Sequence, residues 1–179
     1  MKLAALALVL ACTHASPVAA PTTAKACEGP EYRQLDFWVG DWTLNVHARS
    51  KPGVDEWRDT HGTQHITRTL QNCAIEENFS ALPPIAFAGR SFSMFDAIAK
   101  RWRQTWVDDS GSYLAFTGGP EGDGFALYGE PRELGGKPFQ MRMVWSKITP
   151  TSLRWEWQRS EDNWATTQVM IAIDYVRAT

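Results

Sequence analysis

The fold is decided by the stretch Leu35-Asp36-Phe37-Trp38-Val39-Gly40-Asp41-Trp42, which holds three aromatic residues, one glycine and two aspartates in eight positions. It follows a segment rich in Ala, Pro and Thr, and it precedes an alternating strand pattern that fills the rest of the chain. We expect Phe37, Trp38 and Trp42 to plug one end of a β-barrel, because tryptophan combines a large apolar body with a single N–H donor. Gly40 is expected to make the turn into the first strand.

Ten short segments have the pattern of β-strands. Apolar and polar residues alternate with a period of two, or β-branched residues dominate, and turn-forming residues separate the segments. The predicted strands cover residues 42–47, 61–70, 74–81, 88–96, 101–108, 112–117, 125–130, 139–148, 153–159 and 166–177. Residues 31–37 predict a short helical turn, and no segment after residue 40 has a helical period.

Short antiparallel strands joined by tight turns favour an all-β fold, a closed up-and-down barrel of about ten strands. Closure removes the exposed edges that such a meander would otherwise present. A barrel of this size is wide enough to enclose a cavity. The alternative is a two-sheet sandwich, but that fold needs long crossover connections, which the short turns disfavour. A chain of 179 residues suits one domain, expected over residues 27–179.

Residues 1–26 have the composition of an export signal followed by a flexible tether. The apolar run is too short to span a bilayer. Val9-Leu10-Ala11 followed by Cys12 resembles the bacterial lipobox, whose cysteine is lipidated and becomes the mature N-terminus. The alternative is ordinary signal cleavage, after Ala15 or within residues 24–26. We therefore expect an exported protein, either periplasmic or tethered to a membrane through a lipid on Cys12.

Two cysteines remain in the expected domain, Cys27 and Cys73. An even pair in an exported chain favours a disulfide, which would join the N-terminal segment to the third predicted strand. A bond that closes a loop of this length typically stabilises a fold by ~2–4 kcal/mol. The alternative is a pair of free buried thiols.

Composition and motifs exclude several classes of function. The 18 basic and 20 acidic residues leave a net charge of −2 with no long run of either sign, so the electrostatic footprint of a nucleic-acid-binding protein is missing. His61 and His65 lie ~13 Å apart along one strand, too far to chelate one metal ion. The sequence has no nucleophile elbow and no phosphate-binding loop. We expect no cofactor and no metal, and the sequence does not indicate an oligomeric state.

Gly40-Asp41-Trp42 resembles the Gly-x-Trp signature with which lipocalins enter their first strand. In that superfamily the tryptophan closes the barrel floor, and a basic residue near the end of the last strand packs over it. Arg177 stands at that place in this chain. The resemblance thus implies a cation–π contact between Arg177 and Trp42, worth ~0.5–2 kcal/mol.

Residues 27 to 177 also resemble an uncharacterised bacterial family of exported, lipocalin-like (calycin-type) domains with a motif of the type FDFWxGxW. The similarity lies at residues 37–42, 72–78, 89–92 and 102–108. It implies a calycin-type barrel and carries no catalytic residues across. Ten-stranded haem-binding barrels of the nitrobindin type ligate iron through a histidine near the C-terminus. This chain has no histidine after His65, which disfavours that mode of haem binding.

Aromatic and polar side chains that share strand faces are the candidates for ligand contact. A cavity that holds a ligand combines apolar walls with a few polar anchors. The candidates are Trp102, Gln104, Trp106, Trp145, Arg68 and Arg103. Trp38, Gly40, Trp42 and Arg177 are expected to be structural.

The function that we expect is binding of a small apolar or aromatic ligand inside an exported barrel, with the membrane contacted only through an N-terminal lipid. One alternative is a calycin-type enzyme, an isomerase, cyclase or hydratase, that uses an internal carboxylate. Glu77 and Asp108 are the candidates for that group, because burial would raise the pKa of a carboxyl and make it a general acid. The other alternative is a structural envelope lipoprotein that binds no ligand.

Overall fold

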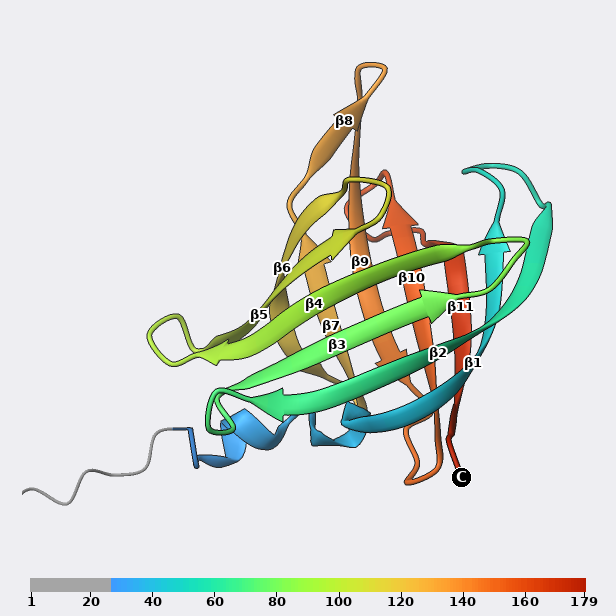
Figure 1. Ribbon diagram of the computed structural model, residues 1–179. Coiled ribbons are helices and arrows are strands. Elements are labelled where there is room, and N and C mark those ends of the chain that lie inside the picture. Colours follow the sequence, from blue (N-terminus) through green and yellow to red (C-terminus); the bar gives the residue numbers. More distant parts are fainter. Residues whose placement is uncertain (1–26) are drawn as a thin grey trace, which may run out of the picture.

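The computed structural model describes residues 27–179, which form two short 3-10 helices and eleven strands (Figure 1). The helices are η1 (Pro30–Arg33) and η2 (Asp36–Trp38). The strands are β1 (Gly40–Arg49), β2 (Trp57–Thr69), β3 (Ala74–Ala81), β4 (Phe87–Asp96), β5 (Arg101–Asp108), β6 (Tyr113–Glu121), β7 (Gly124–Gly129), β8 (Arg132–Leu134), β9 (Lys137–Ser146), β10 (Ser152–Ser160) and β11 (Gln168–Arg177). Among these residues no helix is long and apolar enough to cross a membrane.

Ten of the strands close into an antiparallel barrel. Each pairs with its neighbour in sequence, β7 pairs with β9, and the pairing of β11 with β1 completes the ring. The predicted up-and-down barrel with a short N-terminal helical turn is therefore confirmed, and the sandwich is not formed. The extra strand, β8, pairs only with β9 and prolongs that hairpin beyond the rim (Figure 1).

The alternation of side chains decides which residues enter the interior. In β2 the residues Thr60, Gly62, Gln64 and Ile66 are buried, and each residue between them is exposed. A closed barrel has only an inner and an outer face, so every second residue points inward whatever its polarity. Polar residues that fall on the inward positions are thus buried, Gln64 among them.

The N-terminal helices close one end of the barrel, the lower end in Figure 1. Trp38 of η2 and Trp42 of β1 are both buried there, and the Trp42 Nε1–H donates a hydrogen bond to the Trp38 carbonyl at 2.8 Å. The Trp38 ring packs edge-on against Trp145, with 5.2 Å between ring centroids, and Trp145 packs against Phe125 at 5.8 Å. This end of the barrel is a solid aromatic core, which we call the floor.

Arg177 joins the end of the last strand to the start of the first. Its guanidinium carbon lies 3.7 Å from the centroid of the Trp42 ring, so the implied cation–π contact is present. Its Nη1–H also donates to the Val39 carbonyl at 2.6 Å, where the chain leaves η2. Gly40 follows with φ at +133°, and a Cβ there would lie 2.0 Å from the Arg177 Nη1. Glycine is therefore required at this turn both by the backbone angle and by the space that Arg177 fills.

The expected disulfide is confirmed. Cys27 and Cys73 are bonded, with their Cα atoms 5.0 Å apart and a separation of 46 positions in the sequence. The bond fixes the segment ahead of η1 to the turn that enters β3. The predicted signal segment and the lipidation site at Cys12 lie outside the described residues.

Gly40→Ala should destabilise the protein by about 1–3 kcal/mol through backbone strain alone, since this region of φ and ψ is accessible almost only to glycine. Displacement of Arg177 from Trp42 should add to that loss. Urea unfolding measures the change. Gly119→Ala is the matched control, because Gly119 also lies in the barrel wall but has no atom within 4 Å of an added Cβ. Equal stability of the two variants would contradict the role given to Gly40.

Candidate functional site

Above the floor the barrel is hollow. The interior cavity has a volume of about 200 Å³ and is walled largely by aromatic side chains. These are Trp38, Phe79, Phe87, Trp106, Phe116, Trp155, Trp157 and Tyr175. Pockets for drug-sized molecules usually measure ~300–1,000 Å³. The cavity therefore suits a smaller molecule.

Three predicted ligand contacts lie in the floor instead of the cavity wall. Trp102, Gln104 and Trp145 point inward and are buried, but none of them lines the cavity. The Trp102 Nε1–H donates to Gln34 Oε1 at 2.9 Å, and the Gln104 Nε2–H donates to Ser93 Oγ at 2.9 Å. Alternation along a strand gives the face of a residue but not its depth in the barrel, and these three residues lie too deep. Of the four uncharged candidates, only Trp106 reaches the cavity.

The two predicted arginine anchors do not line the cavity either. Arg68 is held at the floor by an ion pair with Asp36 and by a hydrogen bond of 2.8 Å to the Tyr32 carbonyl. Arg103 is one residue out of step with the inward positions of β5, so its side chain points outward. It is 55% exposed and lies 2.8 Å from the Asp96 carboxylate. Arg68 and Arg103 are therefore structural and surface residues.

Glu77 is the one charged side chain at depth in the cavity. It is 6% exposed and lies on β3. The Nε2–H of Gln64 on β2 donates to its Oε1, and the Oγ–H of Ser91 on β4 donates to its Oε2. Burial raises the pKa of Glu77 to about 7, while the hydrogen bonds from Ser91 and Gln64 oppose that rise. At neutral pH the carboxyl is thus poised between its acid and its carboxylate.

Asp108, the second candidate acid, also lines the cavity but behaves differently. Burial acts to raise its pKa, but hydrogen bonds from Ser110, Trp106 and Ser112 outweigh burial and lower the pKa of Asp108 to about 2. The Trp106 Nε1–H donates to Asp108 Oδ2 at 2.8 Å. Asp108 is therefore a carboxylate at neutral pH.

The two carboxyl groups do not form a catalytic pair. Strand β4 separates β3 from β5, and Asp108 lies two residues beyond Trp106, which is level with Glu77. At ~4.8 Å per strand and ~3.3 Å per residue, the backbones of Glu77 and Asp108 are roughly 12 Å apart. They share no hydrogen-bond partner among the contacts that each makes.

Polar groups that the sequence did not single out surround Glu77. Tyr175 of β11 is fully buried, and its pKa is raised well above the ordinary value by burial and by the nearby Glu77 carboxylate. The Trp38 Nε1 and the Gln64 Oε1 are buried without a hydrogen-bond partner among the described residues. In the sequence, the only signal for Gln64 and Ser91 is that they are polar residues at inward-facing positions of their strands.

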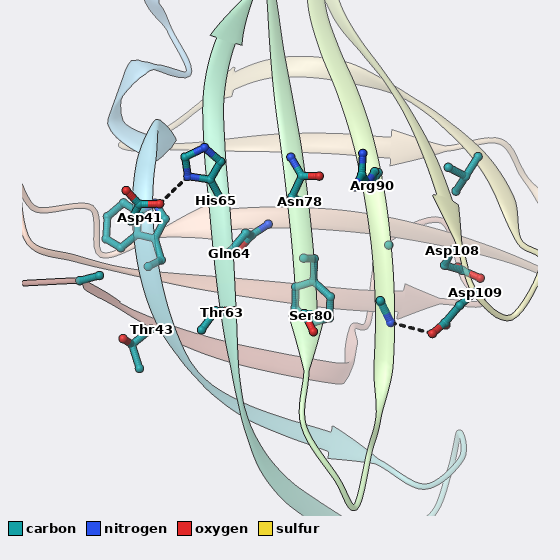
Figure 2. Close-up of a pocket in the computed structure, with 16 residues that line it drawn as sticks. Asp41, Thr43, Thr63, Gln64, His65, Asn78, Ser80, Arg90, Asp108 and Asp109 are labelled. Carbon is teal, nitrogen blue, oxygen red and sulfur yellow. Dashed lines mark hydrogen bonds and ion pairs between the residues drawn. The ribbon is translucent and has the colours of Figure 1, made fainter.

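A wider groove runs over the outside of β1 to β5 (Figure 2), with a volume of about 740 Å³. One row of outward side chains crosses these strands at one level: Asp41, His65, Asn78, Arg90 and Val107. His65 Nδ1 pairs with Asp41. Except for the half-buried Asn78, this row is exposed to solvent. Ligand sites bury most of the ligand surface, so the smaller enclosed cavity is the better candidate.

Metal ligation has no candidate in the part of the chain that the structure describes. No group of three His, Cys, Asp or Glu side chains is close enough together to hold an ion. His47, His61 and His65 each pair with a neighbouring side chain, namely Asp59, Asn45 and Asp41.

The fold and the cavity define a closed antiparallel barrel with an aromatic-walled interior. The family model described as "Protein of unknown function (DUF1579)" matches residues 28–177, and the chain belongs to this family. No curated protein matches the sequence. The chain is similar to a solved structure described as "Structure of EF1p2_mFAP2b bound to DFHBI", with 10% identity, coverage of 83% of this chain and 99% of that chain, and a TM-score of 0.41.

Glu77→Gln should make the protein more stable at high pH. The folded protein holds the Glu77 proton up to about pH 7, whereas the unfolded chain releases it near pH 4.5. The stability of the wild type must therefore fall as pH rises through this window, by about 3 kcal/mol in total. Glutamine keeps both hydrogen-bond partners and removes the titration.

The measurement is urea unfolding of wild type and Glu77→Gln at pH 5 and pH 8. The advantage of the variant should be larger at pH 8. Glu76→Gln is the matched control, because Glu76 pairs with the same two strands but does not line the cavity. A similar pH-dependent gain in both variants would refute the assignment to Glu77.

Proposed function

We propose that this chain is an exported, lipocalin-like barrel that binds a small apolar or aromatic ligand in its interior. The observation that carries the proposal is the cavity: an aromatic-walled space in the barrel interior with one buried polar cluster at Glu77. A few polar groups in an apolar pocket are the usual composition of a small-molecule site. A barrel that served only as a structural plug would have no need for a hollow of this kind.

Two aromatic walls would hold a flat ligand between them. On one side the rings of Phe87 and Trp106 are stacked, with centroids 6.2 Å apart, and Phe79 packs edge-on against Trp106. On the other side Trp155 and Trp157 of β10 are stacked at 6.4 Å with 7° between their planes. In the strand order, β4 and β10 lie five places apart in a ring of ten, so these walls face each other.

Binding is tested by titrating the protein with 2-phenylethanol, naphthalene, 2-phenylethylamine and 3-phenylpropanoate while tryptophan emission is recorded. At least one compound should give a saturable change. Ala81→Leu should weaken its binding at least tenfold, because Ala81 lines the cavity and the larger side chain would fill it. Ala115→Leu is the control, since Ala115 is exposed on β6. If no compound binds the wild type, or if both variants bind it equally well, the proposal fails.

Export is the second part of the proposal, and the Cys27–Cys73 bond supports it, since disulfides persist in oxidising compartments. Mass spectrometry of protein recovered from its native cells tests it. We expect a mature chain that begins at a lipidated Cys12. A mature chain that begins after Ala15 or within residues 24–26 would support export and refute the lipid. A chain that retains Met1 would overturn both.

A second candidate function is catalysis by the internal carboxyl. The observation in its favour is the pKa of about 7 for Glu77, which suits a general acid or base at neutral pH. The distance to Asp108 disfavours mechanisms that need two carboxylates on one substrate. Turnover of a bound ligand that is lost in Glu77→Gln, with binding retained, would establish this function.

A further inference from the structure

The charges inside the cavity have one sign. Two of its lining side chains are ionisable acids, Glu77 and Asp108, and no lysine, arginine or histidine of residues 27–179 lines it. The nearest positively charged side chains make their contacts outside the cavity. Arg68 pairs with Asp36 at the floor, and Arg177 stacks on Trp42. The cavity is therefore negative in potential whenever either acid is ionised.

The surroundings of Glu77 leave its charge without a counter-ion. Gln64 and Ser91 face it from the neighbouring strands β2 and β4, and Tyr175 faces it from β11, with Trp38 of η2 beside Tyr175. None of these groups is cationic at any pH, and the titratable ones are Tyr175 and, nearer the mouth, Asp108. A carboxylate buried in an apolar site is costly unless a positive charge pairs with it. The chain itself supplies no such charge at this place.

The walls add a second preference for positive charge. The faces of aromatic rings carry negative electrostatic potential and attract ammonium groups, with tryptophan the strongest. Trp106, Trp155 and Trp157 line the cavity together with the two acids. Cages of aromatic rings recognise organic ammonium ions in proteins, and a carboxylate among the rings adds an ion pair.

A buried acceptor lies next to the carboxyl. The Oε1 of Gln64 accepts no hydrogen bond of good geometry among the described residues, although the Nε2 of the same amide donates to Glu77 and the Tyr175 hydroxyl lies beside the Gln64 side chain. Unpartnered buried acceptors are rare in folded proteins. A protonated amine beside Glu77 would bring both a positive charge and N–H donors to this region, whereas a quaternary ammonium would bring the charge alone.

We propose that the ligand of the cavity is a small organic cation, an amine or quaternary ammonium on an apolar or aromatic body, whose nitrogen lies beside Glu77. This inference rests on the proposed function and specifies its ligand class. Anionic ligands such as fatty acids are disfavoured, because they would place a like charge beside Glu77 and Asp108. Neutral ligands would fill the walls but leave the Glu77 carboxylate without a counter-ion.

The test compares three molecules of similar size and shape by isothermal titration calorimetry with the full-length protein. They are 2-phenylethylamine, a cation; 2-phenylethanol, which is neutral; and 3-phenylpropanoate, an anion. At pH 8 the cation should bind at least tenfold more tightly than the alcohol, and the anion should bind most weakly. If the alcohol binds as tightly as the cation, the cation proposal is overturned while the proposed binding function stands. If none of the three binds, the proposed function fails as well.

Trimethyl(2-phenylethyl)ammonium separates the titration of the protein from that of the ligand, because its charge is fixed. Its affinity should rise about tenfold or more from pH 5.5 to pH 8.5 as Glu77 ionises. This measurement uses the wild-type protein, so it tests the role of Glu77 even if Glu77→Gln does not fold. An affinity that is independent of pH would overturn the role of Glu77.

Two variants complete the test. Glu77→Gln should weaken binding of the fixed cation at pH 8.5 at least tenfold, and this loss should be several times larger than any loss for 2-phenylethanol. Glu76→Gln removes the same charge from the adjacent position of β3 and should change neither. An equal loss in both variants would show a general electrostatic effect and contradict the pairing with Glu77.

Discussion

The contact between Arg177 and Trp42 joins the two ends of the described barrel. The guanidinium lies on the indole ring, and its hydrogen bond to Val39 fixes the chain where it turns into β1. That turn needs Gly40, because any larger residue would collide with Arg177. With the turn fixed, Trp38 is buried against Trp145 and closes the floor. The contact between Arg177 and Trp42 lies where β1 pairs with β11, which is the pairing that closes the ring.

Closure and filling together explain where the cavity lies. Because the N-terminal helices enter at one end, the large side chains of that end meet them and leave no space. Trp102 and Trp145 are fully buried there. Farther from the helices, the same alternation of inward residues has nothing to pack against at the centre, and Trp106 and Trp157 border a hollow. The cavity thus results from a floor that fills only part of the barrel interior. The polar cluster around Glu77 marks the lower limit of the cavity.

The sequence predicts the fold better than it predicts the site. Strands β3 and β5 have the predicted bounds, since proline pairs and an Asp-Ser-Gly turn end them sharply. Strand β8 is missed, because Pro131 and Gly135-Gly136 have the composition of a loop even though the segment pairs with β9. The alternation within one strand gives the face of a residue but not its depth, so Trp106 lines the cavity whereas Trp102 and Trp145 point inward at the level of the floor. Gln64 and Ser91 are missed because their importance depends on Glu77, a residue of another strand.

The contacts that hold the N-terminal segment against the barrel lie at the floor, and this has a consequence for how the opposite end can change. The disulfide, the Arg177 stack and the helices are independent of the turns between β3 and β4, between β5 and β6 and between β10 and β11. Surface connections tolerate insertion and substitution when the scaffold does not depend on them. Insertions or substitutions in these turns should therefore leave the base of the barrel intact, and the length and chemistry of the open end can be changed without loss of the fold.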